Sequence, residues 1–302
     1  MIDLTLSQNL QGHQNPIFAL SAGLDSSTFY SAGNDKGVVE WDLSEGKFRR
    51  ILCAVPASVY ALHLLQEQQI LVLGLRSGEV WVVDINEQRL VAKLLTGKGA
   101  IFSVQSIHEK NELVAIGEEG VAYVWSLDKF ELLYNFRVAE TAVRCMALYS
   151  GGNHIVFGDK NGVIHLYDVS DFKEVTKSKV HSMPVTTLVV DDIYLYSGGR
   201  DAKLHQLNLF DLTSKETISA HMFTVYAAIP HRNLPILATI SRDKSIKLWD
   251  TPSLALRKNI SRERGSEDGH RLSINTAIWI GDRLVTAGDD KIIKVWDLSG
   301  NL

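Results

Sequence analysis

The sequence predicts an all-β protein made of seven similar units, and three observations support this prediction. A Trp-Asp pair, or a pair at the equivalent position, recurs along the chain every 40–47 residues. The segments between these pairs are short apolar runs rich in β-branched residues and bounded by turn residues, which is typical of buried β-strands. No segment has the apolar spacing of an amphipathic helix of useful length. Seven units of four short strands predict a seven-bladed β-propeller, in which each blade covers the faces of its neighbours.

Two anchors define the repeat. The first is the pair that ends the third strand of each unit: Trp41-Asp42, Val83-Asp84, Trp125-Ser126, Tyr167-Asp168, Leu207-Asn208, Trp249-Asp250 and Trp296-Asp297. The second is the apolar residue that opens the first strand of each unit: Ile17, Val59, Ile101, Val143, Val185, Val225 and Ile274. Both anchors give seven units, so we expect one propeller domain over residues 1–302 with these repeats: 13–52, 55–95, 97–137, 139–178, 181–218, 221–257 and 270–297.

The seventh unit has no outer strand of its own. The sequence ends at VWDLSGNL, soon after Trp296-Asp297, whereas other units continue into a further strand such as KFRRILCAV. The segment of residues 3–10, DLTLSQNL, precedes the first repeat and has no partner within it. We expect this N-terminal strand to complete the last blade and close the ring, because a sheet edge would otherwise be left open.

Composition is ordinary for a folded globular protein, with 302 residues, 45% hydrophobic and 22% charged. Cys53 and Cys145 lie in apolar surroundings, so we expect buried free thiols in a reducing compartment rather than a disulfide. The N-terminal segment lacks the basic and apolar regions of a signal peptide, and no apolar run approaches the ~20 residues that span a bilayer. These features predict a cytoplasmic protein that has no membrane partner and is monomeric on its own.

The residues resemble the WD-repeat family over essentially the whole chain. A Gly-His pair or a lone His, a Ser/Thr–x–x–x–Asp turn and the Trp-Asp pair occur in this order in several units. In that family a His, a Ser or Thr, an Asp and a Trp form a hydrogen-bonded tetrad inside a blade. The resemblance therefore implies tetrads in units one, six and seven and a partial one in unit five: His13, Ser31, Asp35, Trp41; His221, Thr239, Asp243, Trp249; His270, Thr286, Asp290, Trp296; and His181, Ser197, Asp201.

The remaining units depart from this pattern. Leu207 replaces the Trp of unit five, while Val55, Gly97 and Ala139 stand at the His position of units two to four, where the turn Asp is also missing. We expect those three blades to rely mainly on apolar packing. A catalytic triad is needed once, whereas these His-Ser-Asp sets recur at blade spacing, which indicates structural bracing.

The resemblance also implies where a partner would bind. In WD-repeat proteins the residue after the opening apolar position tends to face the central opening, and the residue before the turn Asp tends to lie at the same end. At these positions the chain carries aromatic and basic candidates for partner binding: Phe18, Tyr60, Phe102, Tyr226, Arg144, Lys160, Arg200 and Arg242. Aromatic and Arg side chains are typical anchors of protein interfaces, and the basic residues would suit acidic or phosphorylated segments. The alternative is that the aromatics fill the channel and the basic residues are ordinary solvated surface.

We therefore expect a non-catalytic interaction scaffold or adaptor that binds other proteins on one face of the propeller. The alternative is a propeller enzyme or small-ligand binder with its site in the central channel. The net charge of −4 and the lack of a broad basic stripe disfavour nucleic acid as a partner.

No cofactor is expected either, because the sequence contains no phosphate-binding loop. The histidines outside the tetrads show no metal-ligand spacing, so no metal site is expected from them: His63, His108, His154, His165, His205 and His231. The polar connection over residues 257–273 is either a binding loop or a plain solvent loop.

Overall fold

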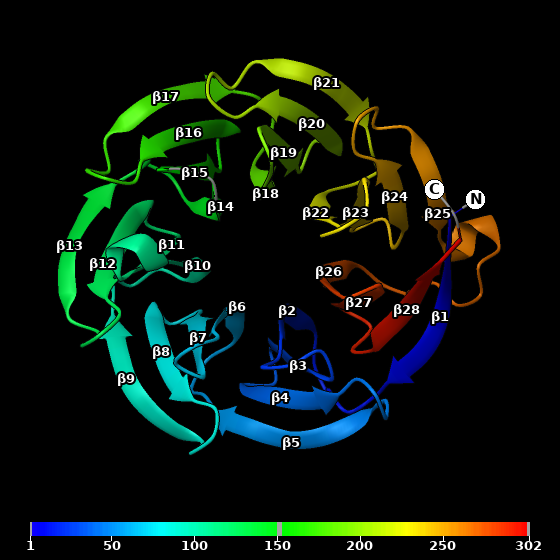
Figure 1. Cartoon of the computed structure of the whole chain (residues 1–302), viewed down its shortest axis with the longest axis horizontal. Helices are drawn as coiled ribbons and strands as arrows, with labels where there is room; N and C mark the ends of the chain where they lie inside the picture. Colours follow the sequence, from blue (N-terminus) through cyan, green and yellow to red (C-terminus); the bar gives the residue numbers. More distant parts are fainter. Residues whose placement is uncertain (1, 150–152, 301–302) are drawn as a thin grey trace.

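The computed structural model describes residues 2–149 and 153–300, and it consists of seven four-stranded antiparallel sheets arranged in a ring (Figure 1). The prediction of an all-β, seven-bladed propeller is therefore confirmed. The helical segments among the described residues are two short 3-10 turns, η1 (His108–Lys110) and η2 (Arg262–Arg264). Within the same residues, no helix has the length and apolarity needed to cross a membrane.

In the first six blades the strands follow chain order from the centre of the ring to its rim (Figure 1). Blade 1 contains β2 (Ile17–Ala22), β3 (Thr28–Gly33), β4 (Gly37–Asp42) and β5 (Lys47–Ala54). Blade 2 contains β6 (Val59–Leu65), β7 (Ile70–Leu75), β8 (Glu79–Asp84) and β9 (Arg89–Leu95). Blades 3 and 4 contain β10 (Ile101–Ile107), β11 (Glu112–Gly117), β12 (Val121–Ser126), β13 (Leu132–Arg137), and β14 (Val143–Leu148), β15 (His154–Asp159), β16 (Val163–Asp168), β17 (Glu174–Lys179). Blades 5 and 6 contain β18 (Val185–Asp191), β19 (Tyr194–Gly199), β20 (Lys203–Asn208), β21 (Ser214–Ser219), and β22 (Val225–Pro230), β23 (Ile236–Ser241), β24 (Ile246–Asp250), β25 (Leu256–Ile260).

Blade 7 is assembled from both ends of the sequence. Its inner strands are β26 (Ile274–Ile280), β27 (Arg283–Gly288) and β28 (Ile293–Ser299), and its outer strand is β1 (Asp3–Leu10). β1 runs antiparallel to β28, from the Asp3–Ser299 pair to the Leu10–Ile293 pair. The expected closure of the ring by the N-terminal strand is confirmed, and Figure 1 shows β1 lying against β28 at the rim.

Seven apolar clusters form the core, one at each interface between neighbouring blades. The second strand of a blade shows this burial most clearly, since every residue of β7 and of β11 is buried. A strand that is covered on both faces needs apolar residues at successive positions instead of alternating ones. The ring therefore gains its stability from repeated contacts between adjacent blades.

The two cysteines differ in solvent exposure. Cys145 on β14 is buried, but Cys53 on the outer strand β5 is half-buried, so the prediction of two buried thiols is wrong for Cys53. Both cysteines are free, and burial still raises the pKa of the Cys53 thiol to about 11.

The long connection between blades 6 and 7 is partly ordered by its own hydrogen bonds, including Arg264 N to Ser261 O at 3.1 Å.

Candidate functional site

A β-bulge interrupts the innermost strand of every blade at its second residue. In β2, Ile17 pairs with Gly33 and Ala19 pairs with Ala32, so Phe18 has no partner on β3. The first strands of the other six blades show the same shift in register. The residues skipped in this way are Phe18, Tyr60, Phe102, Arg144, Thr186, Tyr226 and Asn275. A bulge re-aims the side chain of its extra residue, which allows all seven to turn toward the central opening.

These seven side chains line one cavity of about 910 Å³. The other lining residues are Arg76, Lys98, Ala100, Glu118 and Asp289. Five of the predicted binding residues are thus brought together: Phe18, Tyr60, Phe102, Arg144 and Tyr226. Lys160, Arg200 and Arg242 are exposed and lie outside this lining.

Three aromatic rings and one guanidinium form a continuous row along the cavity wall. The ring centroids of Phe18 and Tyr60 are 5.3 Å apart, and those of Tyr60 and Phe102 are 5.7 Å apart. The guanidinium carbon of Arg144 lies 5.0 Å from the centre of the Phe102 ring. Each ring is half-buried, so the row presents apolar surface to the cavity next to a positive charge.

The opposite wall is polar and tied to the backbone. Thr186 Oγ1 lies 3.0 Å from Gly198 O and 2.5 Å from Val225 O, and its one hydroxyl proton is shared between these two acceptors. Asn275 Nδ2 donates to Ile17 O at 3.0 Å and to Asp289 Oδ1 at 2.8 Å. Two of these contacts, Thr186 with Val225 O and Asn275 with Ile17 O, join neighbouring blades and help to hold this half of the cavity rigid.

The cavity also contains unpaired positive charge. Among the described residues, Arg76, Lys98 and Arg144 form no ion pair and no side-chain hydrogen bond, although Arg144 packs on Phe102. The two acids of the lining are already engaged, since Glu118 Oε2 accepts from Ala100 N at 3.1 Å and Asp289 accepts from Asn275. An anionic group entering the cavity would therefore find free basic partners. Sequence reasoning did not select Lys98, because it lies in a connection outside the repeated positions.

Exposed apolar side chains accompany the basic residues that lie outside the cavity. Met222 is 75% exposed and Phe223 is 54% exposed, and the Arg242 guanidinium carbon lies 5.9 Å from the centre of the Phe223 ring. Met183 and Leu272 occupy similar positions in blades 5 and 7 and are also exposed. Phe223, Met183 and Leu272 each follow a tetrad histidine by two residues, a spacing that could have identified these exposed side chains from the sequence.

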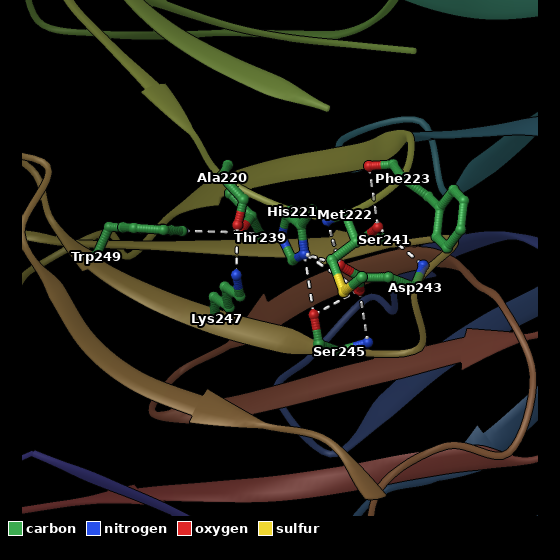
Figure 2. Close-up of polar contacts among 10 residues, drawn as sticks. All are labelled: Ala220, His221, Met222, Phe223, Thr239, Ser241, Asp243, Ser245, Lys247 and Trp249. Atoms are coloured by element: carbon green, nitrogen blue, oxygen red, sulfur yellow. Dashed lines mark hydrogen bonds and ion pairs between the residues drawn. The ribbon is translucent and has the colours of Figure 1, made fainter. Parts of the chain in front are cut away.

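The tetrad side chains form hydrogen-bonded chains inside the blades. In blade 6, His221 Nδ1 donates to Asp243 Oδ2 (3.0 Å), and Trp249 Nε1 donates to Thr239 Oγ1 (2.8 Å), whose hydroxyl lies 2.8 Å from His221 Nε2 (Figure 2). The same sequence of contacts occurs in blade 1 and in blade 7. The hydroxyl-bearing residues are fully buried: Ser31, Ser197, Thr239 and Thr286. A buried hydroxyl that both donates and accepts suits bracing and cannot reach a substrate.

Blades 3 and 4 replace the missing tetrads with other polar contacts. In blade 3, Glu119 accepts from Lys98 N at 2.9 Å, and Gly97 at the His position leaves room for this longer side chain. In blade 4, Asp159 lies 3.5 Å from His165 Nε2 and accepts from two backbone N–H groups. The prediction that these blades rely mainly on apolar packing is therefore incomplete.

The stability of blade 4 is expected to depend on pH through His165. Burial alone would lower the pKa of His165, but hydrogen bonds to Asp159 and Glu174 outweigh burial and raise the pKa above 6.5. Because the folded state holds the proton more tightly than the unfolded state, this contribution is complete below pH 6.5 and is lost as pH rises through the folded pKa. Urea unfolding of the wild type and His165→Asn at pH 6 and pH 9 should show a larger difference at pH 6. An equal difference at both values would contradict this assignment.

Comparisons with known proteins agree with the repeat pattern. A family model described as "WD domain, G-beta repeat" matches residues 4–42, 212–250 and 263–297, which contain the three complete tetrads. Kinesin-like protein KIF21B of Mus musculus is 22% identical over 95% of the chain and 18% of its own length. Actin-interacting protein 1 of Caenorhabditis elegans is 22% identical over 97% of the chain and 48% of its own length. Guanine nucleotide-binding protein subunit beta of Zea mays is 24% identical over 99% of the chain and 85% of its own length.

The chain thus spans less than half the length of the first two relatives and most of the third. Three observations agree: the ring of seven four-stranded blades, the tetrads at blade spacing and the family matches that coincide with them. The chain is a seven-bladed β-propeller that is similar to the WD-repeat family, whose model matches three parts of it.

Proposed function

We propose that the chain is a non-catalytic scaffold that binds a segment of another protein at the central cavity. The observation that carries this proposal is the convergence of seven bulged residues on one cavity, with an aromatic row ending at Arg144. Aromatic and Arg side chains on a rigid frame supply contact area and charge with little loss of conformational entropy on binding. The names of two relatives, an actin-interacting protein and a G-protein β subunit, support a role in contacts with other proteins.

The chemistry of the cavity favours a segment that combines an apolar side chain with an acidic or phosphorylated one. The apolar side chain would pack on the row formed by Phe18, Tyr60 and Phe102. The anionic group would meet Arg144 and the other free bases of the lining, Arg76 and Lys98. The contact would extend beyond the cavity to Lys160, Arg200 and Arg242 and to the exposed Phe223. We further propose that the chain acts as a monomer in the cytoplasm.

Affinity capture followed by mass spectrometry tests this proposal. Phe102→Ala and Arg144→Glu are each expected to reduce capture of the main partner at least about tenfold, since central interface anchors typically contribute 2 kcal/mol or more. A joint Arg200→Glu and Arg242→Glu variant should cause a smaller loss, because these residues lie outside the cavity. Capture should also weaken as salt is raised, because the contact includes charge.

Lys173→Glu is the matched control, because Lys173 is exposed on the connection to the outer strand β17 and is absent from the cavity lining. It should capture the same proteins as the wild type. Equal capture by wild type, Phe102→Ala and Arg144→Glu would overturn the proposed face.

A small-molecule site in the same cavity is the second candidate function. The volume of about 910 Å³ falls within the range of about 300–1,000 Å³ that is usual for ligand pockets. Native mass spectrometry of the purified chain separates the two functions. A bound metabolite that Arg144→Glu releases would favour the small-molecule site, whether catalytic or not.

A further inference from the structure

Blade 5 brings two histidines and an aspartate into one buried cluster. His181 precedes β18, Asp201 lies in the turn between β19 and β20, and His205 lies on β20. One ligand atom from each side chain lies within 4.8 Å of the other two, and His181 and His205 are 1% and 6% exposed. We propose that these three side chains bind a divalent transition-metal ion, with Zn²⁺ as the first candidate.

The His205 ring has one nitrogen in use and one without a partner. Its Nδ1 lies 2.9 Å from Thr217 Oγ1, whereas its buried Nε2 has no hydrogen-bond partner among the described residues. In metal sites the second nitrogen of a ligating histidine is commonly held by a polar group, as Thr217 holds Nδ1 here. Nε2 of His205 is therefore a buried nitrogen whose lone pair is available to bind a metal ion.

The missing tryptophan of blade 5 changes what His181 can do. In complete tetrads the Trp N–H donates to the hydroxyl, so the hydroxyl proton is directed at the His Nε2. Leu207 replaces that Trp, and the hydrogen bond found for Ser197 Oγ within the described residues is with His181 Nε2, at 2.8 Å. The Ser197 hydroxyl can therefore accept a hydrogen bond from the Nε2–H group of His181. That tautomer leaves Nδ1, which lies 2.9 Å from Asp201 Oδ1, with a lone pair for a metal ion.

Blades 6 and 7 place a cation where blade 5 has His205. Lys247 and Lys294 stand two residues before the tetrad Trp, as His205 stands two residues before Leu207. The positive charge of each lysine interacts favourably with the carboxylate of the tetrad aspartate in its blade. Blade 5 keeps the carboxylate, Asp201, at the same turn position. A bound divalent ion would supply in blade 5 the positive charge that a lysine supplies in blades 6 and 7.

The residue types and the space fit a zinc-type ion. Two imidazole nitrogens and a carboxylate oxygen suit Zn²⁺ and related ions, whereas Mg²⁺ prefers oxygen ligands. Bonds of about 2.0–2.1 Å place tetrahedral ligand atoms about 3.3 Å apart. The three ligand atoms here lie within 4.8 Å of one another, so binding of an ion would draw them closer together. Gly199 lies against His181 Nδ1 and Asp201 Oδ1, where any Cβ would occupy the space between ring and carboxylate.

Zinc uptake by the chelator-treated chain tests the site. The wild type is expected to bind one more Zn²⁺ than His205→Lys and His205→Val, and its melting temperature should rise with Zn²⁺ but not with Mg²⁺. These variants carry residues that stand at the same position in other blades, Lys247 and Val39, so both should fold in the presence of EDTA. Thr217→Val should bind Zn²⁺ about 10–100-fold more weakly than the wild type, because it removes only the partner of the ligating ring.

Co²⁺ gives a second readout that does not depend on the variants. Bound Co²⁺ in the wild type should show the visible absorption of a four-coordinate nitrogen and oxygen site, without the sulfur charge-transfer band that Cys53 or Cys145 would cause. Equal Zn²⁺ uptake by the wild type and His205→Lys would overturn the site. So would a Co²⁺ spectrum with a sulfur band, or no uptake at all.

Discussion

Removal of residues 2–10 is expected to lower the free energy of unfolding by an amount close to the whole stability of the chain. This segment contains β1, which supplies the outer strand of blade 7 and seven paired positions along β28. Its buried side chains also reach both neighbouring interfaces. Ile2 and Leu4 pack between blades 6 and 7, and Leu10 packs between blades 7 and 1. The strand therefore fastens three consecutive blades, not one.

The magnitude follows from burial. Ile2, Leu4 and Leu10 are 8%, 4% and 4% exposed, and burial of a large apolar side chain contributes roughly 1.5–3 kcal/mol, or about 5–9 kcal/mol for three. Native domains are stable by only about 5–15 kcal/mol. Polar contacts add to the loss, including Lys294 Nζ to Asn9 Oδ1 at 2.7 Å and Gln8 Nε2 to Leu43 O at 2.9 Å.

Thermal and urea unfolding followed by circular dichroism measure this effect. Leu4→Ala should lower the free energy of unfolding by about 2–5 kcal/mol as a single-site version of the deletion. Thr5→Ala is the matched control, because Thr5 lies on the exposed face of the same strand and surface substitutions usually change stability by less than about 0.5 kcal/mol. An unchanged melting temperature after deletion would show that β1 does not hold the ring closed.

Much of the fold and part of the cavity could be predicted because they depend on position within the repeat. The spacing of the opening apolar residue located the first strand of each blade, and the residue after it proved to be the bulged one in all seven. The cavity residues Phe18 and Arg144 follow directly from that rule. A periodic fold makes such positions equivalent, so a local pattern in the sequence carries three-dimensional information.

What could not be predicted lies in contacts between segments that no repeat rule connects. His181, Asp201 and His205 come from three segments, and their spacing resembles no metal motif in a linear reading. Lys98 enters the cavity from a connection that replaces a tetrad His with Gly97. The exposure of Cys53 depends on the depth of an outer strand within its blade, which hydrophobicity alone does not determine.

Asp243→Asn is expected to destabilise the chain by about 3–5 kcal/mol, because it leaves a buried polar network with mismatched partners. The carboxylate accepts from His221 Nδ1, from Met222 N at 2.9 Å and from Ser245 N at 3.0 Å (Figure 2). An amide keeps one acceptor oxygen, but its NH₂ group would face these same donors. Asp128→Asn is the control, since it removes the same charge from an exposed position and should change stability little.

The pH dependence of this difference separates the buried carboxylate from a general effect of charge. Burial alone would raise the pKa of Asp243, but the hydrogen bond and charge of His221 outweigh it and hold the pKa well below 3.8. The folded state therefore binds the proton more weakly than the unfolded state, and the stabilisation is present above pH 3.8 and lost as pH falls further. The stabilities of wild type and Asp243→Asn in urea unfolding should differ most above pH 5, and the difference should shrink progressively as pH falls below about 3.8. A difference that stays constant across this range would mean that the mutation acts through packing and not through the ionised carboxylate.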